Sequence, residues 1–111
     1  MEIIQTKTAD TIVLQLEGRL DTNTASSFEE RLMNIISDNE NRIIVDFSEL
    51  DFISSSGLRV LLMAGKKLKT TNGKLGLCAL KDHIKEVFDV AGFTMLFSMF
   101  PNQDEAIKNI K

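Results

Sequence analysis

Three consecutive serines form the part of this sequence best suited to chemistry. Ser54, Ser55 and Ser56 follow a short apolar run at residues 43–45 and precede Gly57, and the apolar residues after them have helical spacing. The pattern predicts a strand, then a loop, with the hydroxyls where a helix begins. The first N–H groups of a helix have no partner within it and carry the positive end of its dipole, so this place suits a hydroxyl oxygen or a phosphate.

Two interpretations of the serine run stay open when only the residues are considered. A serine at a helix start is ordinarily an N-cap, whose oxygen accepts from an N–H two or three residues on and stabilises the helix by about 1 kcal/mol. Three serines before a glycine exceed what one cap requires, and functional groups are often carried on a loop that a rigid scaffold presents. The run is therefore a candidate both for capping and for modification.

The elements that must position these serines alternate between strand and helix. Strands are expected at residues 3–7, 11–18, 42–47, 74–79 and 96–100, with helices ending near residue 37, spanning 58–68 and 82–91, and beginning near 102. This order predicts an α/β fold with right-handed crossovers. We expect a single domain over residues 1–111, with a mixed, mostly parallel sheet of about five strands, about four helices, and the first strand antiparallel at the edge.

Capping residues predict where two of the helices begin. Ser26 with Glu29 has the spacing of a capping box for the first helix. Ser27 with Glu30 has the same spacing. Asp82 is expected to cap the third helix.

The serine run and its surroundings resemble the sequence pattern of the anti-sigma factor antagonists, whose domain is called STAS. The loop of that family reads roughly Asp-Ser-Ser-Gly-Leu or Asp-Ser-Ala-Gly-Leu, and the serine after the aspartate is the phosphorylated one. Ser55 takes the phosphoserine position here, and Ser54 stands where the family has its aspartate. The run Gly18-Arg19-Leu20-Asp21 is similar to the family's Gly-Glu-Leu-Asp. The resemblance covers nearly the whole chain.

The resemblance implies a phosphorylation-controlled binding protein and not an enzyme. The unmodified form would bind an anti-sigma factor that is also an ATP-dependent serine kinase, and so release a sigma factor. Phosphorylation of Ser55 would dissociate the complex, and a serine phosphatase would reset it. Ser54 and Ser56 are less favoured acceptors. The absence of the family's aspartate at position 54 is expected to slow the kinase or to let Ser54 or Ser56 compete with Ser55.

The neighbourhood of the phosphorylation site is predicted from the strand order. If the second and third strands are parallel neighbours, their following loops share one edge of the sheet, which places Asp21 beside Ser54, Ser56 and Gly57. Asp46, at the end of the expected third strand, is also expected nearby. Asp21 is either a cap for the first helix or the group that orients the accepting serine or meets the kinase.

The docking surface is expected to include the outward side of the second helix. Met63 is the apolar candidate there, and methionine suits adaptable interfaces. Met95 and Met99 form either a second patch or part of the core. The expected partner-binding residues are Asp21, Ser55, Arg59, Met63 and Lys66.

Composition excludes several functional classes. A net charge of −3, with no basic cluster beyond Lys66, Lys67 and Lys69, argues against direct nucleic-acid binding. No apolar run approaches the roughly 20 residues that span a bilayer, and the first residues do not resemble a signal peptide, so no membrane association and a cytoplasmic location are expected. Cys78 is expected to be buried apolar filler.

Two other functions are alternatives to the phosphorylation switch. One is a constitutive STAS scaffold in a lipid-transport ATPase of the ABC type or in a sensory assembly, with serines that only cap. The other is an enzyme with a serine nucleophile, but the single histidine, His83, has no evident route to Ser55, and a Gly-x-Ser-x-Gly elbow is missing. No metal or cofactor is expected, and the sequence leaves self-association open.

Overall fold

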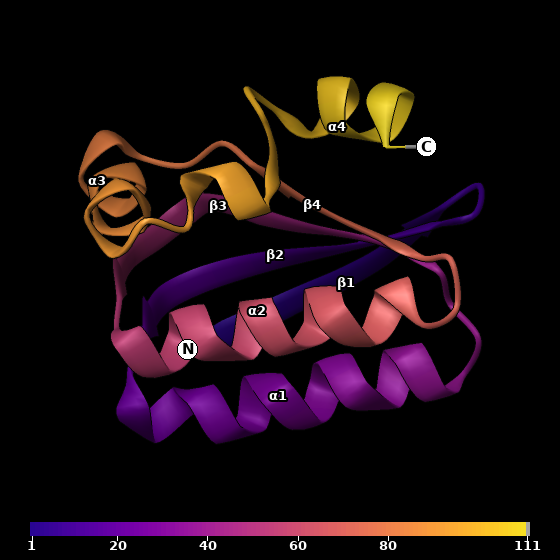
Figure 1. The fold of residues 1–111 in the computed structure, drawn as a ribbon, viewed down its shortest axis with the longest axis horizontal. Helices are drawn as coiled ribbons and strands as arrows, with labels where there is room; N and C mark the ends of the chain where they lie inside the picture. The colour runs from indigo at the N-terminus through magenta and orange to yellow at the C-terminus, as the bar shows by residue number, and fades with distance from the viewer. Residues whose placement is uncertain (111) are drawn as a thin grey trace.

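One five-stranded sheet organises the chain. In the computed structural model, which describes residues 1–110, the strands lie in the order β1-β2-β3-β4-β5 (Figure 1). β1 (Glu2–Thr8) pairs antiparallel with β2 (Thr11–Leu20), and β3 (Arg42–Ile53), β4 (Lys74–Cys78) and β5 (Ser98–Phe100) continue the sheet in parallel. The predicted mixed sheet with an antiparallel edge strand is confirmed.

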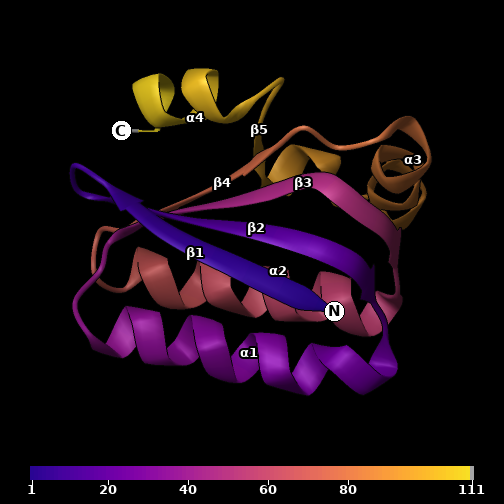
Figure 2. The same ribbon diagram turned by 180° about the vertical axis from the view of Figure 1, so that it is seen from behind.

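Helices cover the two faces unequally. α1 (Thr22–Ser37) and α2 (Ser55–Lys69) lie side by side on one face, and α3 (Asp82–Ala91) packs into the same core at the end of the sheet. α4 (Gln103–Asn109) covers the opposite face (Figures 1 and 2). The 3-10 turn η1 (Thr94–Leu96) follows α3 and shortens the expected fifth strand to three residues. Because β2 and β3 are parallel neighbours, their carboxyl ends share one edge of the sheet, and each leads directly into a helix there.

The central strand is buried on both faces, as its apolar run predicts. Ile43 and Val45 face the main core beneath α1 and α2, while Ile44 belongs to a smaller cluster beneath α4. All three are inaccessible to solvent. Cys78 lies in the smaller cluster, and burial, reinforced by the nearby charge of Asp46, raises the pKa of its thiol to about 12. The prediction that Cys78 is buried is confirmed.

α3 packs against the main core through aromatic contacts. The ring of Phe88 meets that of Phe47 edge-on at a centroid distance of 6.1 Å and that of Phe97 at 5.6 Å. All of Phe88 and Phe47 is buried. Such edge-to-face pairs add to the free energy gained by burial, so Phe88, together with the buried Ile84, holds α3 in position.

Both predictions of helix starts from capping residues are wrong. α1 begins at Thr22, well before Ser26 and Ser27, because β2 runs to Leu20 and leaves Asp21 as the cap. The N-cap of α3 is Lys81, whose side chain makes no capping hydrogen bond, and Asp82 lies in the first turn. An acidic residue in that turn still interacts favourably with the helix dipole.

Candidate functional site

The ends of β2 and β3 bring the serine run beside Asp21. Leu20 and Ile53 are register partners, and the N–H of Ser54 donates to the carbonyl oxygen of Leu20 at 2.9 Å. Gly18 takes a φ of 105°, which glycine tolerates, at one of the irregularities where β2 follows the bend of β3. The prediction that the two loops meet at one edge is confirmed.

The three serines occupy different environments. Ser54 is the N-cap of α2, and its Oγ accepts from the N–H of Gly57 at 3.2 Å. Ser55 is the first residue of the helix and is exposed, while Ser54 and Ser56 are half-buried. Ser54 therefore caps α2, and Ser55 is accessible to solvent.

Gly57 allows α2 to begin directly against the strand ends. A Cβ atom at this position would lie 2.7 Å from Cγ of Leu20 and 3.1 Å from Cγ1 of Ile53, closer than carbon atoms pack. The absence of a side chain at residue 57 thus lets the first turn of α2, with Ser55, sit close to Leu20 and Asp21. The atoms that approach residue 57 are those of the protein's own core.

The carboxylate of Asp21 caps α1. Its Oδ1 accepts from the N–H groups of Asn23 at 3.0 Å and Thr24 at 3.1 Å, and Oγ1 of Thr24 accepts from the N–H of Asp21 at 2.9 Å. Partial loss of water acts to raise the pKa of Asp21, but the hydrogen bonds from Thr24 and Asn23, with the charge of Arg19, outweigh it and lower the pKa. The interpretation of Asp21 as a helix cap is confirmed. Its backbone lies beside the serines, since the neighbouring Leu20 accepts the hydrogen bond from Ser54.

The prediction that Asp46 lies near the serines is wrong. β3 continues for seven residues beyond Asp46, to Ile53. At about 3.3 Å per residue, Asp46 and Ile53 are separated by about 23 Å along the strand. Asp46 is buried, and its oxygens accept from the N–H of Ser48 at 2.8 Å and from Nε2 of Gln103 at 2.5 Å. Asp46 therefore helps to anchor α4 instead of serving the site.

Polar residues from the start of α3 reach the same edge, which the sequence did not reveal. Nζ of Lys81 lies 2.8 Å from Oδ1 of Asp51, and Nε2 of His83 lies 2.8 Å from the carbonyl oxygen of Asp51. The hydrogen bond from Lys81, and then its charge, lowers the pKa of Asp51. The guanidinium of Arg19 lies 4.3 Å from the ring centre of Phe52 beside them. No local pattern signals contacts across some 30 residues.

A groove of about 380 Å³ opens between the start of α2 and α3. The expectation that His83 has no evident route to Ser55 is corrected, since both residues line this groove. The chain brings them together because α3 returns over the carboxyl end of β3. The lining residues are Ser55, Leu58, His83, Glu86, Val87, Val90 and Ala91.

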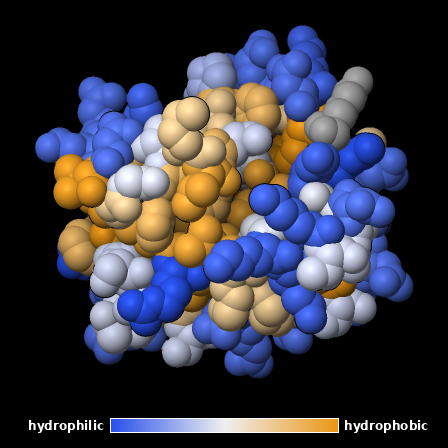
Figure 3. Space-filling view, in the orientation of Figure 1, coloured by the Kyte–Doolittle hydropathy of each residue, from blue (hydrophilic) through white to orange (hydrophobic). Residues whose placement is uncertain are grey.

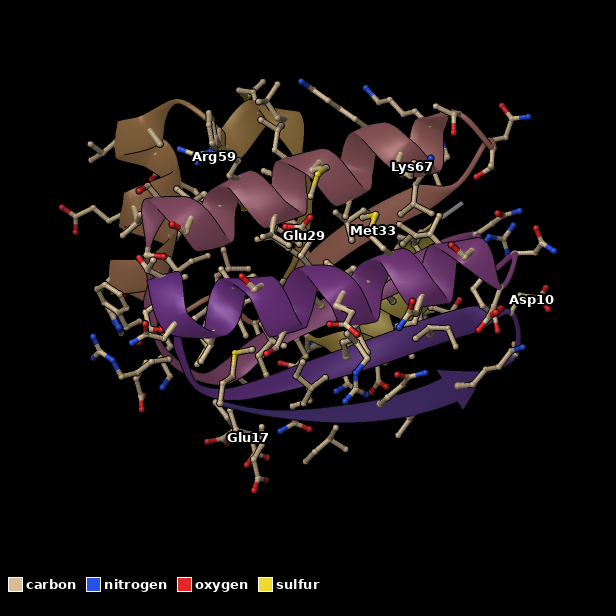
Figure 4. All side chains as sticks on the ribbon, turned by 90° about the horizontal axis from the view of Figure 1, so that it is seen from below. Asp10, Glu17, Glu29, Met33, Arg59 and Lys67 are labelled. Atoms are coloured by element: carbon tan, nitrogen blue, oxygen red, sulfur yellow. The ribbon has the colours of Figure 1, made fainter. Side chains whose placement is uncertain are left out.

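The outward side of α2 is as the helical spacing predicts. Arg59, Met63, Lys66 and Lys67 are exposed. Figure 4 shows α2 alongside α1 with Arg59 and Lys67 on it, and a second hollow between these helices is lined in part by Arg59, Met63 and Glu29. Of the two methionines left open, Met95 is 93% exposed and Met99 packs against the main core.

Across residues 1–110, no group of three or more histidine, cysteine, aspartate or glutamate side chains is placed to hold a metal ion. Within that same range, none of the helices has the length and apolar character needed to cross a bilayer.

The chain is similar to known proteins in both sequence and structure. The STAS domain family model matches residues 2–106. BtrV of Bordetella bronchiseptica, provisionally named an anti-sigma factor antagonist, is 33% identical over 111 residues, covering 100% of this chain and 96% of BtrV. RsfB of Mycobacterium tuberculosis, named an anti-sigma-F factor antagonist, is 25% identical over 89% of this chain and 80% of its own.

Solved structures share the fold. SpoIIAA, titled an anti-sigma factor antagonist in its unphosphorylated form, superposes with a TM-score of 0.77 at 21% identity over 97% of this chain and 96% of SpoIIAA. The phosphorylated form of Bacillus SpoIIAA gives the same TM-score of 0.77 at 23% identity over 99% and 100%.

Proposed function

The chain belongs to the STAS domain family, and we propose that it is an anti-sigma factor antagonist controlled by phosphorylation of Ser55. In its unmodified form it binds an anti-sigma factor that is also a serine kinase, which frees a sigma factor. Phosphate on Ser55 dissociates the complex, and a serine phosphatase restores binding. The names of BtrV and RsfB support the general role.

One observation carries the choice of Ser55. It is the exposed member of the serine run, at the first position of α2, whereas the hydroxyl of Ser54 is engaged as the cap. A kinase must bring the γ-phosphate of ATP in line with the accepting oxygen. An exposed hydroxyl on a rigid helix start meets that need better than its half-buried neighbours.

The proposed switch acts through surface charge. A phosphate adds about −1.5 to −2 charges at neutral pH, and the positive end of the α2 dipole tolerates it, so the domain stays folded. The phosphorylated and the unphosphorylated form of SpoIIAA both share the fold of this chain, which supports a switch without refolding. At a partner surface the same charge is repelled or must be desolvated.

The remaining parts of the proposal follow from this role. The protein is a binding regulator and not an enzyme, acts on transcription without touching DNA, and works in the cytoplasm, where sigma factors meet RNA polymerase. Asp21, Ser55 and the exposed α2 residues Arg59, Met63 and Lys66 form its partner-binding surface. Gly57 and the half-buried serines at 54 and 56 surround the modified hydroxyl.

Phosphopeptide mass spectrometry after incubation with the purified cognate kinase and ATP tests the acceptor. We expect a single phosphate on Ser55, and none on the Ser55→Ala variant. Modification confined to Ser54 or Ser56 would show that the acceptor is wrongly assigned.

Met63→Ala tests whether α2 takes part in the interface. Met63 is 37% exposed, so truncation leaves the core intact, and we expect the dissociation constant for the anti-sigma factor to rise about fivefold, equivalent to about 1 kcal/mol. Isothermal titration calorimetry measures it. Ile4→Ala, at an exposed apolar residue on β1, is the matched control. Equal affinities for wild type and Met63→Ala would remove this part of α2 from the interface.

A further inference from the structure

The groove beside Ser55 is lined mostly by apolar side chains that nothing in residues 1–110 covers. Leu58 forms its floor from α2, and Val87, Val90 and Ala91 form its wall from α3. Val90 is 83% exposed, an unusual position for a valine. The exposed Met95 and Leu96 of η1 extend the apolar surface, and Figure 3 shows apolar residues gathered over α3 and η1 between hydrophilic margins.

We propose that this groove receives an apolar side chain of the anti-sigma factor, and that phosphate on Ser55 acts by excluding it. This inference rests on the proposed function and names the contact that the switch controls. The partner is the one occupant required by the site, because a kinase that transfers phosphate to Ser55 must lie against that hydroxyl and therefore over the adjoining groove.

The charges in the groove favour an apolar occupant over an anion. Glu86 is the acidic member of the lining and repels negative groups. Nε2 of His83 is hydrogen-bonded to the carbonyl oxygen of Asp51. Nζ of Lys81 is paired with the carboxylate of Asp51. The groove thus offers no cluster of uncommitted cations to a phosphate, while its aliphatic wall offers area for burial.

The size of the groove limits what enters. A volume of about 380 Å³ lies near the lower end of the roughly 300–1,000 Å³ found for pockets that enclose small ligands. It accommodates one or two side chains, not a whole helix. An aliphatic or aromatic anchor in such a pocket is the typical centre of a binding hot spot.

Ser55 lines the groove and is exposed, and it can therefore control occupancy. A phosphate there holds a shell of water, and an entering apolar side chain would have to displace that water while leaving the charge unpaired, which is costly. Phosphorylation would thus remove the anchor as well as repel the partner. The groove supplies a physical reason why one modified residue controls a whole interface.

A double-mutant cycle with the purified anti-sigma factor kinase tests the proposal by calorimetry. Val90→Ser should weaken binding about tenfold. Ile4→Ser, at an exposed aliphatic residue on β1, is the matched control and should bind as wild type does. In the Ser55→Asp background, Val90→Ser should weaken binding less than twofold, because the anchor is already excluded. Thermal unfolding of each variant checks that the fold is retained.

The outcomes separate this inference from the function on which it rests. Weakening by Val90→Ser that disappears in the Ser55→Asp background supports the groove. The proposed role of the groove is overturned if Val90→Ser binds with wild-type affinity, or if it lowers the affinity equally in the wild-type and Ser55→Asp backgrounds. Either result leaves the phosphorylation switch in place. Failure of Ser55→Asp itself to weaken binding overturns the proposed function.

Discussion

Ser55→Asp should weaken binding to the anti-sigma factor about a hundredfold, while Ser55→Ala should bind as wild type does. The aspartate places a permanent negative charge at the exposed first position of α2. A close contact with such a charge is expected to cost the complex about 2–4 kcal/mol. The fold should be unaffected, because an acidic residue in the first turn of a helix is stabilising by about 0.3–1 kcal/mol.

The matched control for charge is Ser27→Asp. Ser27 is an exposed serine of α1, outside the serine run, so this variant carries the same net charge without changing the site. Calorimetry gives the affinities, and circular dichroism confirms that all variants are folded. Equal binding by wild type and both Ser55 variants would contradict the switch and favour a constitutive STAS scaffold.

Phe88→Ala should lower the free energy of unfolding by about 3–5 kcal/mol. The ring is fully buried and makes edge-to-face contacts with Phe47 and Phe97, so its removal leaves a cavity between α3 and the sheet. Because a domain of this size is stable by only about 5–15 kcal/mol, the loss should be evident in urea. Equilibrium unfolding followed by circular dichroism measures it.

Val90→Ala is the matched control on the same helix. Val90 is 83% exposed, so its truncation should change the free energy of unfolding by less than about 0.5 kcal/mol. If Phe88→Ala cost no more than this control, α3 would not be fastened through Phe88, and the position of the groove wall would need another explanation.

Much of the architecture is predictable because it depends on short repeats of residue type. Consecutive apolar residues at 43–45 predict a strand buried on both faces, and the helical spacing after Leu58 predicts which side of α2 faces outward. The serine run before Gly57 likewise predicts a helix start, since capping acts within one turn of the helix. Parallel pairing of β2 with β3 is enough to predict that Asp21 lies beside the serines.

Element boundaries were less predictable where long-range pairing decided them. The polar residues after Phe47 suggest the end of a strand, yet residues 49–53 of β3 continue to pair with β2 through two irregularities in register. Asp46 consequently lies far from the serines, bound to Gln103 of α4. Backbone pairing with a neighbouring strand outweighed the weak strand propensity of these residues.

The sequence by itself determined the alternation of strands and helices, the buried central strand and the serine run at a helix start, because each depends on residues within a few positions of one another. Only the tertiary structure decided that Ser54 caps while Ser55 is exposed, that His83 and Val90 share a groove with Ser55, and that Asp46 does not belong to the site. Those facts depend on how α3 packs over the end of β3, through contacts between residues some 30 positions apart that no local pattern encodes.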